Sequence, residues 1–254
     1  MQKLLLLVLT MIISLITSLT ALKAKTIGHY FTETKTIPLT HFENIDSDMI
    51  FNVEVVKSNE EKAVITSNYM QFVEISVKNN TLHIGYKRSQ SLKNVDTKIV
   101  IFAKDVKSVN VSTGSVVKIK NTFGIQKFST ESGGKIFGDS NAKNISIRTE
   151  SGGAFMGNLN TDNLLLNAQS GSSIDIWGKI GIATISAEEA SKIMAAKTNI
   201  SIATVRAESA SSVTLGVSKQ LVATASSMAA IRYKTLSGIK FTAKRDSGGT
   251  IDML

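Results

Sequence analysis

FSTESGGKI, at residues 128–136, decides the fold of this chain, and it returns 19 residues later as IRTESGGAF at residues 147–155. In both copies an apolar residue stands at each end, and seven mostly small or polar residues lie between them. The pattern extends in both directions, from Val109 to Ile251. Such a fixed period indicates a repeat architecture. The second apolar residues of the copies follow one another at steps of 18 to 20 residues: Val117, Ile136, Phe155, Ile174, Ile193, Val213, Ile231 and Ile251.

The residues within each copy alternate in character with a period of two. Phe128 and Thr130 fall on one side of the chain, and Ser129 and Glu131 fall on the other. This alternation indicates β-strands and not helices. A copy of about 19 residues at about 3.3 Å each has a perimeter of about 60 Å, which suits a flattened or triangular coil. Each coil buries its apolar residues only against its neighbours. The sequence therefore predicts an all-β fold, a right-handed parallel β-helix of about eight coils.

Small residues between the apolar anchors predict a tight turn in every coil. Glycine permits a positive φ angle or a close approach of stacked backbones. Alanine stands in the corresponding turns of later copies, at Ala190, Ala210 and Ala229. Alanine there predicts turns that are close-packed and not strictly left-handed. We assign structural turn roles to five glycines: Gly114, Gly133, Gly152, Gly171 and Gly248.

Residues 27–105 lack the repeat but contain alternating segments. We expect a small antiparallel section that covers the first coil, because the ends of a solenoid present unpaired strand edges. This section and the repeats at residues 106–254 are predicted to form one continuous domain. The C-terminal end shows no evident cap, which leaves an end-to-end homo-oligomer open. Strands are predicted at residues 49–56, 63–67, 72–77, 82–86 and 98–102.

The first 24 residues have the layout of a secretory signal peptide. Lys3 precedes an apolar run at residues 4–22, and alanines follow before polar sequence begins. The run is close to the length of about 20 residues that spans a bilayer, so an uncleaved N-terminal anchor is an alternative. We expect an exported protein of the periplasm, the outer membrane or the cell surface.

Composition excludes several kinds of site. The chain has no cysteine, which rules out disulfides, thiolate metal sites, cysteine nucleophiles and a lipoprotein anchor. His29, His41 and His83 lie apart without metal-ligand spacing, and no glycine-rich phosphate loop occurs, so neither a metal nor a cofactor is predicted. The net charge of +9 favours anionic envelope components such as glycans or lipid headgroups, with protein partners left open. Nucleic acid is not an expected partner, because the charge is spread thinly.

Three short stretches near the N-terminus accompany the Ser-Gly-Gly and Ser-Gly-Ser turns: FENI at 42–45, FNVEV at 51–55 and NTLHI at 80–84. Over roughly residues 30–254, the chain resembles the putative auto-transporter adhesin family with a head GIN domain. The resemblance implies a secreted right-handed β-helix of bacterial envelopes, with a role in adhesion and no established activity. The alanine-containing turns and the missing lipoprotein cysteine depart from the family pattern.

A column of polar residues recurs five positions before each second anchor. Stacked carboxylates about 4.8 Å apart repel by about 0.9 kcal/mol per pair in water, so something must offset the repulsion. Arg148 and Arg206 are placed to pair with Glu150 and Glu208. One interpretation is a solvated, charge-balanced face, and the other is a ligand-facing platform for a cation or a carbohydrate. We call this column the ladder: Ser112, Glu131, Glu150, Gln169, Glu188, Glu208, Ser226 and Asp246.

The ladder also bears on catalysis. Carboxylates in adjacent coils lie near the separation of about 5–5.5 Å used by retaining glycosidases, so a polysaccharide-processing enzyme acting near Glu131 and Glu150 is the alternative function. A catalytic pair should be singular and set in a cleft, whereas this feature repeats. We therefore predict an adhesin-like binding or scaffold module with no catalytic residues. If Trp177 is exposed, its ring offers a face on which a sugar can stack. If Trp177 is buried, its ring fills a corner of the core.

Overall fold

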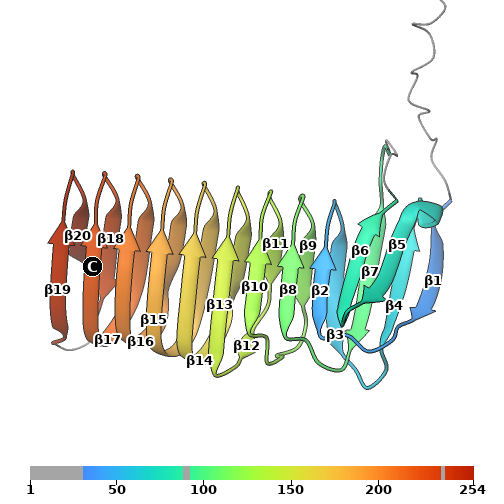
Figure 1. Cartoon of the computed structure of the whole chain (residues 1–254), viewed down its shortest axis with the longest axis horizontal. Coiled ribbons are helices and arrows are strands. Elements are labelled where there is room, and N and C mark those ends of the chain that lie inside the picture. Colours follow the sequence, from blue (N-terminus) through green and yellow to red (C-terminus); the bar gives the residue numbers. More distant parts are fainter. Residues whose placement is uncertain (1–30, 88–91, 236–237) are drawn as a thin grey trace, which may run out of the picture.

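The computed structural model describes residues 31–87, 92–235 and 238–254, which form 20 strands and the short three-ten helix η1 (Met70–Phe72). Figure 1 shows a long stack in which the chain winds repeatedly around one axis. Strands of successive coils pair in parallel over most of the length. The predicted all-β solenoid is confirmed.

Each coil has two flat faces. The long strands belong to both faces, because each bends from the second face to the first: β14 (Ala154–Ala168), β15 (Ser173–Ala187), β16 (Lys192–Ala207) and β17 (Ser212–Ala225). The first face also contains β2 (Asn44–Ser47), β8 (Ser108–Val111), β10 (Lys127–Thr130), β13 (Asn144–Thr149) and β19 (Lys240–Arg245). The second face also contains β3 (Asn52–Lys57), β9 (Val116–Ile119), β11 (Lys135–Phe137), β18 (Ala230–Lys234) and β20 (Thr250–Met253).

The two faces meet at two different edges. At the turn edge, each coil passes from the first face to the second through a tight turn, seen as the pointed loops in Figure 1. At the rounded edge, the chain passes back through the bends of the long strands and through β12 (Ser140–Asn141), which pairs with β14. The rounded edge comprises residues 138–143, 157–162, 177–182, 196–201, 216–219 and 234–239, apart from 236–237.

The apolar anchors stack in the predicted register. Ile136 lies between Val117 of the preceding coil and Phe155 of the following one. The register continues to the last pair, Ile231 and Ile251. All eight second anchors are at most 2% exposed, so the anchors of successive coils merge into one continuous core. Because polar residues alternate with these anchors, both faces are mainly polar outside and mainly apolar inside.

Every turn at the turn edge has a left-handed backbone. In the coil of Glu131, Gly134 N donates to Glu131 O (2.9 Å), while Ser132 and Gly133 have φ angles of 48° and 76°. Two consecutive positive φ angles define a type I′ turn. The five glycines assigned to turns have φ angles from 69° to 79°: Gly114, Gly133, Gly152, Gly171 and Gly248.

The prediction for the alanine turns was wrong. Ala190 and Ala210 have φ angles of 58° and 59°, so they adopt the same left-handed conformation as the glycines. Ala229 lies one residue beyond its turn, where Met228 takes the left-handed position (φ 63°). The turn geometry is fixed by the stacking of coils, and the side chain present does not change it. An L-residue there has a conformational cost that glycine avoids.

This cost predicts opposite effects for two substitutions. We expect Ala210→Gly to raise the free energy of unfolding by about 0.5–1 kcal/mol, because the strained backbone is relieved. Gly133→Ala should lower it by a similar amount through backbone strain alone, since an added Cβ would meet nothing within 4 Å. Urea denaturation of the two variants and the parent chain measures both changes. Equal stability of all three would contradict a strained turn.

The N-terminal section contains antiparallel strands, as expected, and also part of the solenoid. Strand β4 (Lys62–Ser67) pairs antiparallel with β1 (Glu33–Pro38) and with β7 (Thr97–Ala103). Strand β5 (Val73–Lys78) pairs antiparallel with β6 (Thr81–Tyr86). However, β2 and β3 pair in parallel with β8 and β9, which adds one turn before the eight repeats.

The predicted strand at residues 49–56 is therefore divided between a turn and β3. Met49 has a φ angle of 70° and lies at the turn edge of the added coil. The sequence signal was lost here because this turn contains no glycine and because β4 to β7 separate it from the repeats. Period-two alternation does not distinguish parallel from antiparallel pairing.

The C-terminal coil contains an arginine contact that the sequence pattern did not predict. Arg245 pairs with Ala225, so it occupies the column that in earlier coils holds small interior residues such as Ala187 and Ala207. Its guanidinium donates to Ile251 O (2.6 Å) across the end of the core. An inward charge on an edge strand discourages pairing with another chain.

Candidate functional site

The ladder forms a continuous stack along the turn edge. Glu150 N donates to Thr130 O and Glu188 N donates to Ala168 O, both at 2.9 Å. Equivalent bonds connect the other ladder residues to the coil before them. The ladder residues therefore lie directly above one another, one in each coil. Glu131 and Asp246 are exposed, and the residues between them are half-buried.

Ladder carboxylates are engaged by neighbouring side chains. Arg148 forms an ion pair with Glu150, and Arg206 lies 2.6 Å from Glu208. Both pairs were expected from the sequence. Ser226 Oγ also donates to Glu208 Oε1 (3.1 Å). These contacts offset the repulsion between stacked carboxylates, which supports the interpretation of the ladder as a charge-balanced surface.

Removing an arginine that pairs with a ladder carboxylate should destabilise the protein, because the repulsion between stacked carboxylates is then no longer offset. We expect Arg206→Gln to lower the free energy of unfolding by about 0.2–1 kcal/mol, the range for exposed ion pairs. The loss should shrink in high salt, because screening weakens both the attraction and the repulsion. Urea denaturation at low and high salt measures it, with Lys219→Gln on the rounded edge as the matched control. A loss that is equal for both variants, or independent of salt, would contradict an electrostatic role.

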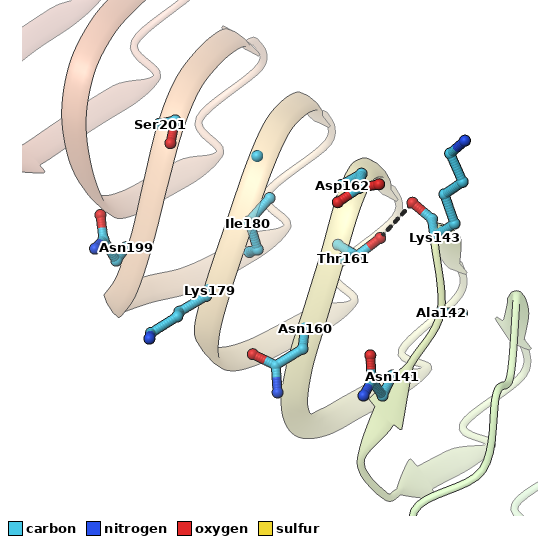
Figure 2. A pocket seen from close by; sticks show the side chains of 11 residues that line it. Asn141, Ala142, Lys143, Asn160, Thr161, Asp162, Lys179, Ile180, Asn199 and Ser201 are labelled. Atoms are coloured by element: carbon cyan, nitrogen blue, oxygen red, sulfur yellow. Dashed lines mark hydrogen bonds between the residues drawn. The ribbon is translucent and has the colours of Figure 1, made fainter.

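The rounded edge contains an open groove of about 550 Å³ that crosses four coils (Figure 2). Asn160 pairs with Asn141 of the preceding coil and with Lys179 of the next, which in turn pairs with Asn199. These four side chains are exposed and form one row, one residue per coil. Figure 2 shows them along one side of the groove.

A second row lines the other side of the same groove. It contains Lys143 and Asp162, with Ser201 further along (Figure 2). Thr161, between the two rows, is committed to the fold, since its hydroxyl lies 3.0 Å from Lys143 O and from Asn163 O. The floor is tightly packed at Gly181, where an added Cβ would lie 2.5 Å from Asp162 O.

The repeat pattern alone did not predict this groove, although the sequence contains a signal for its row of side chains. Asn141 and Asn160 are 19 residues apart, and Asn199 follows 39 residues later, which is two repeat steps. Attention to the period of these asparagines would have identified the row.

Trp177 lies next to the groove on β15. It pairs with Asn158 of the preceding coil and with Lys197 of the following one. Its side chain is half-buried, so it is neither the open stacking face nor the core plug considered from the sequence.

A second groove, of about 390 Å³, lies within the N-terminal section. Its acidic side chains include Asp46 and Glu74. Asp46 is already engaged: it lies 3.2 Å from His83 Nδ1 and accepts from Asn110 Nδ2 at 2.9 Å. Asp46 and His83 of this groove are therefore paired within the protein.

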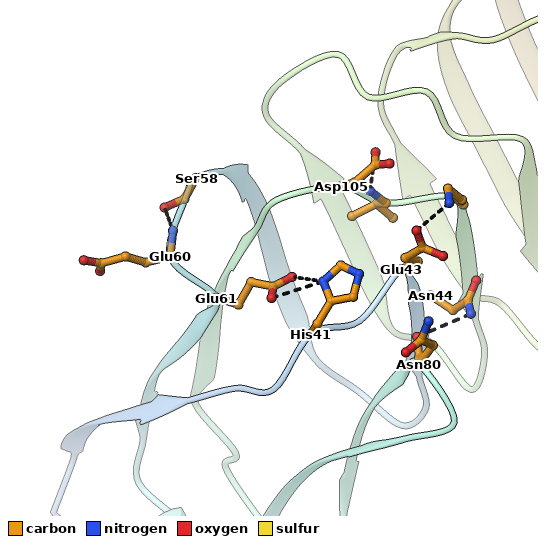
Figure 3. A network of polar contacts seen from close by, with 10 residues as sticks. His41, Glu43, Asn44, Ser58, Glu60, Glu61, Asn80 and Asp105 are labelled. Atoms are coloured by element: carbon orange, nitrogen blue, oxygen red, sulfur yellow. Dashed lines mark hydrogen bonds and ion pairs between the residues drawn. The ribbon is translucent and has the colours of Figure 1, made fainter.

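Polar contacts also join the N-terminal section to the solenoid (Figure 3). Lys107 forms an ion pair with Glu43, and this hydrogen bond lowers the pKa of the Glu43 carboxyl and raises the pKa of the Lys107 ammonium. His41 Nδ1 lies 3.0 Å from Glu61 Oε1. These contacts connect the start of β2 to neighbouring segments, which indicates a structural role.

Neither a metal site nor a membrane-spanning helix is found in the described parts of the chain. Among residues 31–87, 92–235 and 238–254, no three His, Asp or Glu side chains are grouped so that they could hold a metal ion. Within the same ranges, no helix is long and apolar enough to cross a membrane. The predicted signal peptide at residues 1–24 lies outside the described residues.

Solved structures share this fold. A protein described as a putative adhesin from Parabacteroides merdae superposes with a TM-score of 0.78 at 17% sequence identity. The superposition covers 89% of this chain and 100% of the Parabacteroides merdae chain. A protein described as a putative lipid binding protein from Parabacteroides distasonis superposes with a TM-score of 0.77 at 17% sequence identity. The superposition covers 91% of this chain and 100% of the Parabacteroides distasonis chain. At these identities the likeness shows the fold alone.

A search of the curated proteins found no match. A family model does match, over residues 41–235, and its description is "Putative auto-transporter adhesin, head GIN domain". The match covers most of the chain, including the added first coil and most of the repeats. The chain thus belongs to the putative auto-transporter adhesin family with a head GIN domain.

Proposed function

We propose that this protein is an exported, adhesin-like binding and scaffold module of the bacterial envelope that acts without catalysis. The observation that carries the proposal is the open groove on the rounded edge, lined by a row of exposed polar side chains with one residue per coil. A solenoid extends such a row over successive coils without breaking its core. The family and several structural neighbours are named as adhesins, which supports the same role.

The partners that suit these surfaces are glycans or other anionic components of the envelope. The net charge of +9 favours an anionic partner. The ladder is less suitable as the binding surface, because Arg148 and Arg206 already engage its carboxylates. The same pairing counts against the alternative of a polysaccharide-processing enzyme, which would need Glu150 free.

End-to-end assembly is not favoured as the main role. Arg245 crosses the open end of the core, and the outermost strand β19 carries Lys240 and Lys244 on its exposed side. Charges of this kind discourage strand addition. We therefore propose a module that binds through its side surfaces.

A glycan array probed with the purified chain tests the proposal. We expect binding to at least one class of envelope glycan, with no change in the length of the bound glycan over time. The variant Glu131→Ala/Glu150→Ala should bind as the parent does, because the ladder is not the binding surface. Absence of binding to every glycan would overturn the proposal. Release of shorter sugars, lost in the double variant, would instead support the enzyme.

A further inference from the structure

Several polar side chains of the rounded-edge groove have hydrogen-bond donors and acceptors that no other residue in the described part of the chain uses. The amides of Asn141, Asn160 and Asn199 are exposed, and they make no hydrogen bond to any residue that the structure describes. Each amide offers two donors and one acceptor oxygen. Polar groups paired within the fold, such as the hydroxyl of Thr161, lie between the rows and not along them. The row is therefore available to a ligand.

Charge is divided between the two edges of the solenoid. Glu131, Glu189 and Asp246 are exposed at the turn edge, where the half-buried ladder carboxylates add to them. The rounded edge instead carries five exposed lysines, which outnumber its two exposed carboxylates, Asp139 and Asp162. Such a division directs an anionic ligand to the rounded edge and away from the turn edge. The lysines are Lys143, Lys179, Lys197, Lys219 and Lys234.

Within the groove the charge is also positive. The charged residues of the lining are Lys143, Lys179 and Asp162, so two cations stand against one carboxylate, and Figure 2 shows both lysine side chains extending away from Asp162. Neither lysine forms an ion pair within the described residues. A ligand carboxylate would therefore find cations that the fold leaves uncommitted, and ammonium–carboxylate hydrogen bonds are stronger than neutral ones.

The spacing of the row suits a linear ligand with repeated polar groups. Side chains in register on successive coils lie about 4.8 Å apart. Sugar hydroxyls both donate and accept, as the asparagine amides do. The groove volume of about 550 Å³ lies within the range of about 300–1,000 Å³ typical of small-molecule sites.

We propose that this groove binds an anionic oligosaccharide whose acidic groups are carboxylates, such as a uronic acid polymer. Lys143 and Lys179 pair with the ligand carboxylates, while Asn141, Asn160 and Asn199 hydrogen-bond the sugar hydroxyls. The proposal rests on the binding function proposed above and assigns it a site and a class of ligand. Gly181 keeps the floor of the groove free of a side chain.

Calorimetric titration of the purified full chain with hexagalacturonate tests the site. We expect Lys143→Gln/Lys179→Gln to weaken binding about tenfold, as expected when two charge-assisted contacts are lost. The matched control is Lys192→Gln, which removes an exposed lysine from the second face and should leave binding unchanged. Binding should also weaken as salt is raised. Far-UV circular dichroism checks that each variant keeps its fold.

The single tryptophan gives an independent signal of location. Trp177 lies two residues before Lys179 on β15, so its fluorescence should change on titration with hexagalacturonate and not with the neutral maltohexaose. Vesicles of phosphatidylglycerol distinguish a sugar from an anionic lipid surface. Binding to the vesicles without binding to hexagalacturonate would overturn the proposal.

The remaining outcomes separate this inference from the proposed function. Equal affinity for maltohexaose, or equal weakening by Lys192→Gln, would overturn the anionic groove. If hexagalacturonate does not bind while the glycan array shows another ligand, the groove assignment fails and the binding function stands. If no glycan of any kind binds, both fail.

Discussion

Backbone hydrogen bonds join the tight turns of successive repeats, through one amide in each turn. Gly133 N donates to Ser151 O (3.0 Å), and Gly152 N donates to Ser170 O (3.1 Å), so each turn is bonded to the next. This interlock sets the register of the neighbouring strands, because a slip by one residue would turn every anchor outward. It also holds Ala190 and Ala210 in a left-handed conformation that alanine otherwise avoids. The core, both faces and both edges depend on this register.

The register gives the two edges different chemistry. At the turn edge it stacks one ladder residue on the next, and the carboxylates must be balanced by Arg148 and Arg206. At the rounded edge it aligns asparagines and lysines whose polar atoms the fold leaves uncommitted. The acidic ladder therefore needs cations from within the protein to balance it. The row of asparagines and lysines is left free to contact a ligand. The proposed binding role follows from that contrast.

The sequence predicted the solenoid well, because the anchors recur with a nearly constant step and are almost fully buried. Pairing of Arg148 with Glu150 was also predictable, since their spacing places them on one side of a strand. The first coil was missed, because its turn at Met49 contains no glycine and four strands separate it from the repeats. The period of the asparagines indicates a row, but the groove beside that row depends on the bends of β14 and β15, which the period does not predict.

Native-state hydrogen exchange at the turn edge is the most direct test of the interlock. Amides of Gly133, Gly152 and Ala210 should exchange slowly although the turns are exposed, because each donates to the next coil. The amides of Ser132 and Ser151, which donate to no backbone oxygen among the described residues, should exchange quickly. This alternation of protected and unprotected neighbours is the predicted result. Fast exchange at both kinds of position would contradict hydrogen bonding between successive turns.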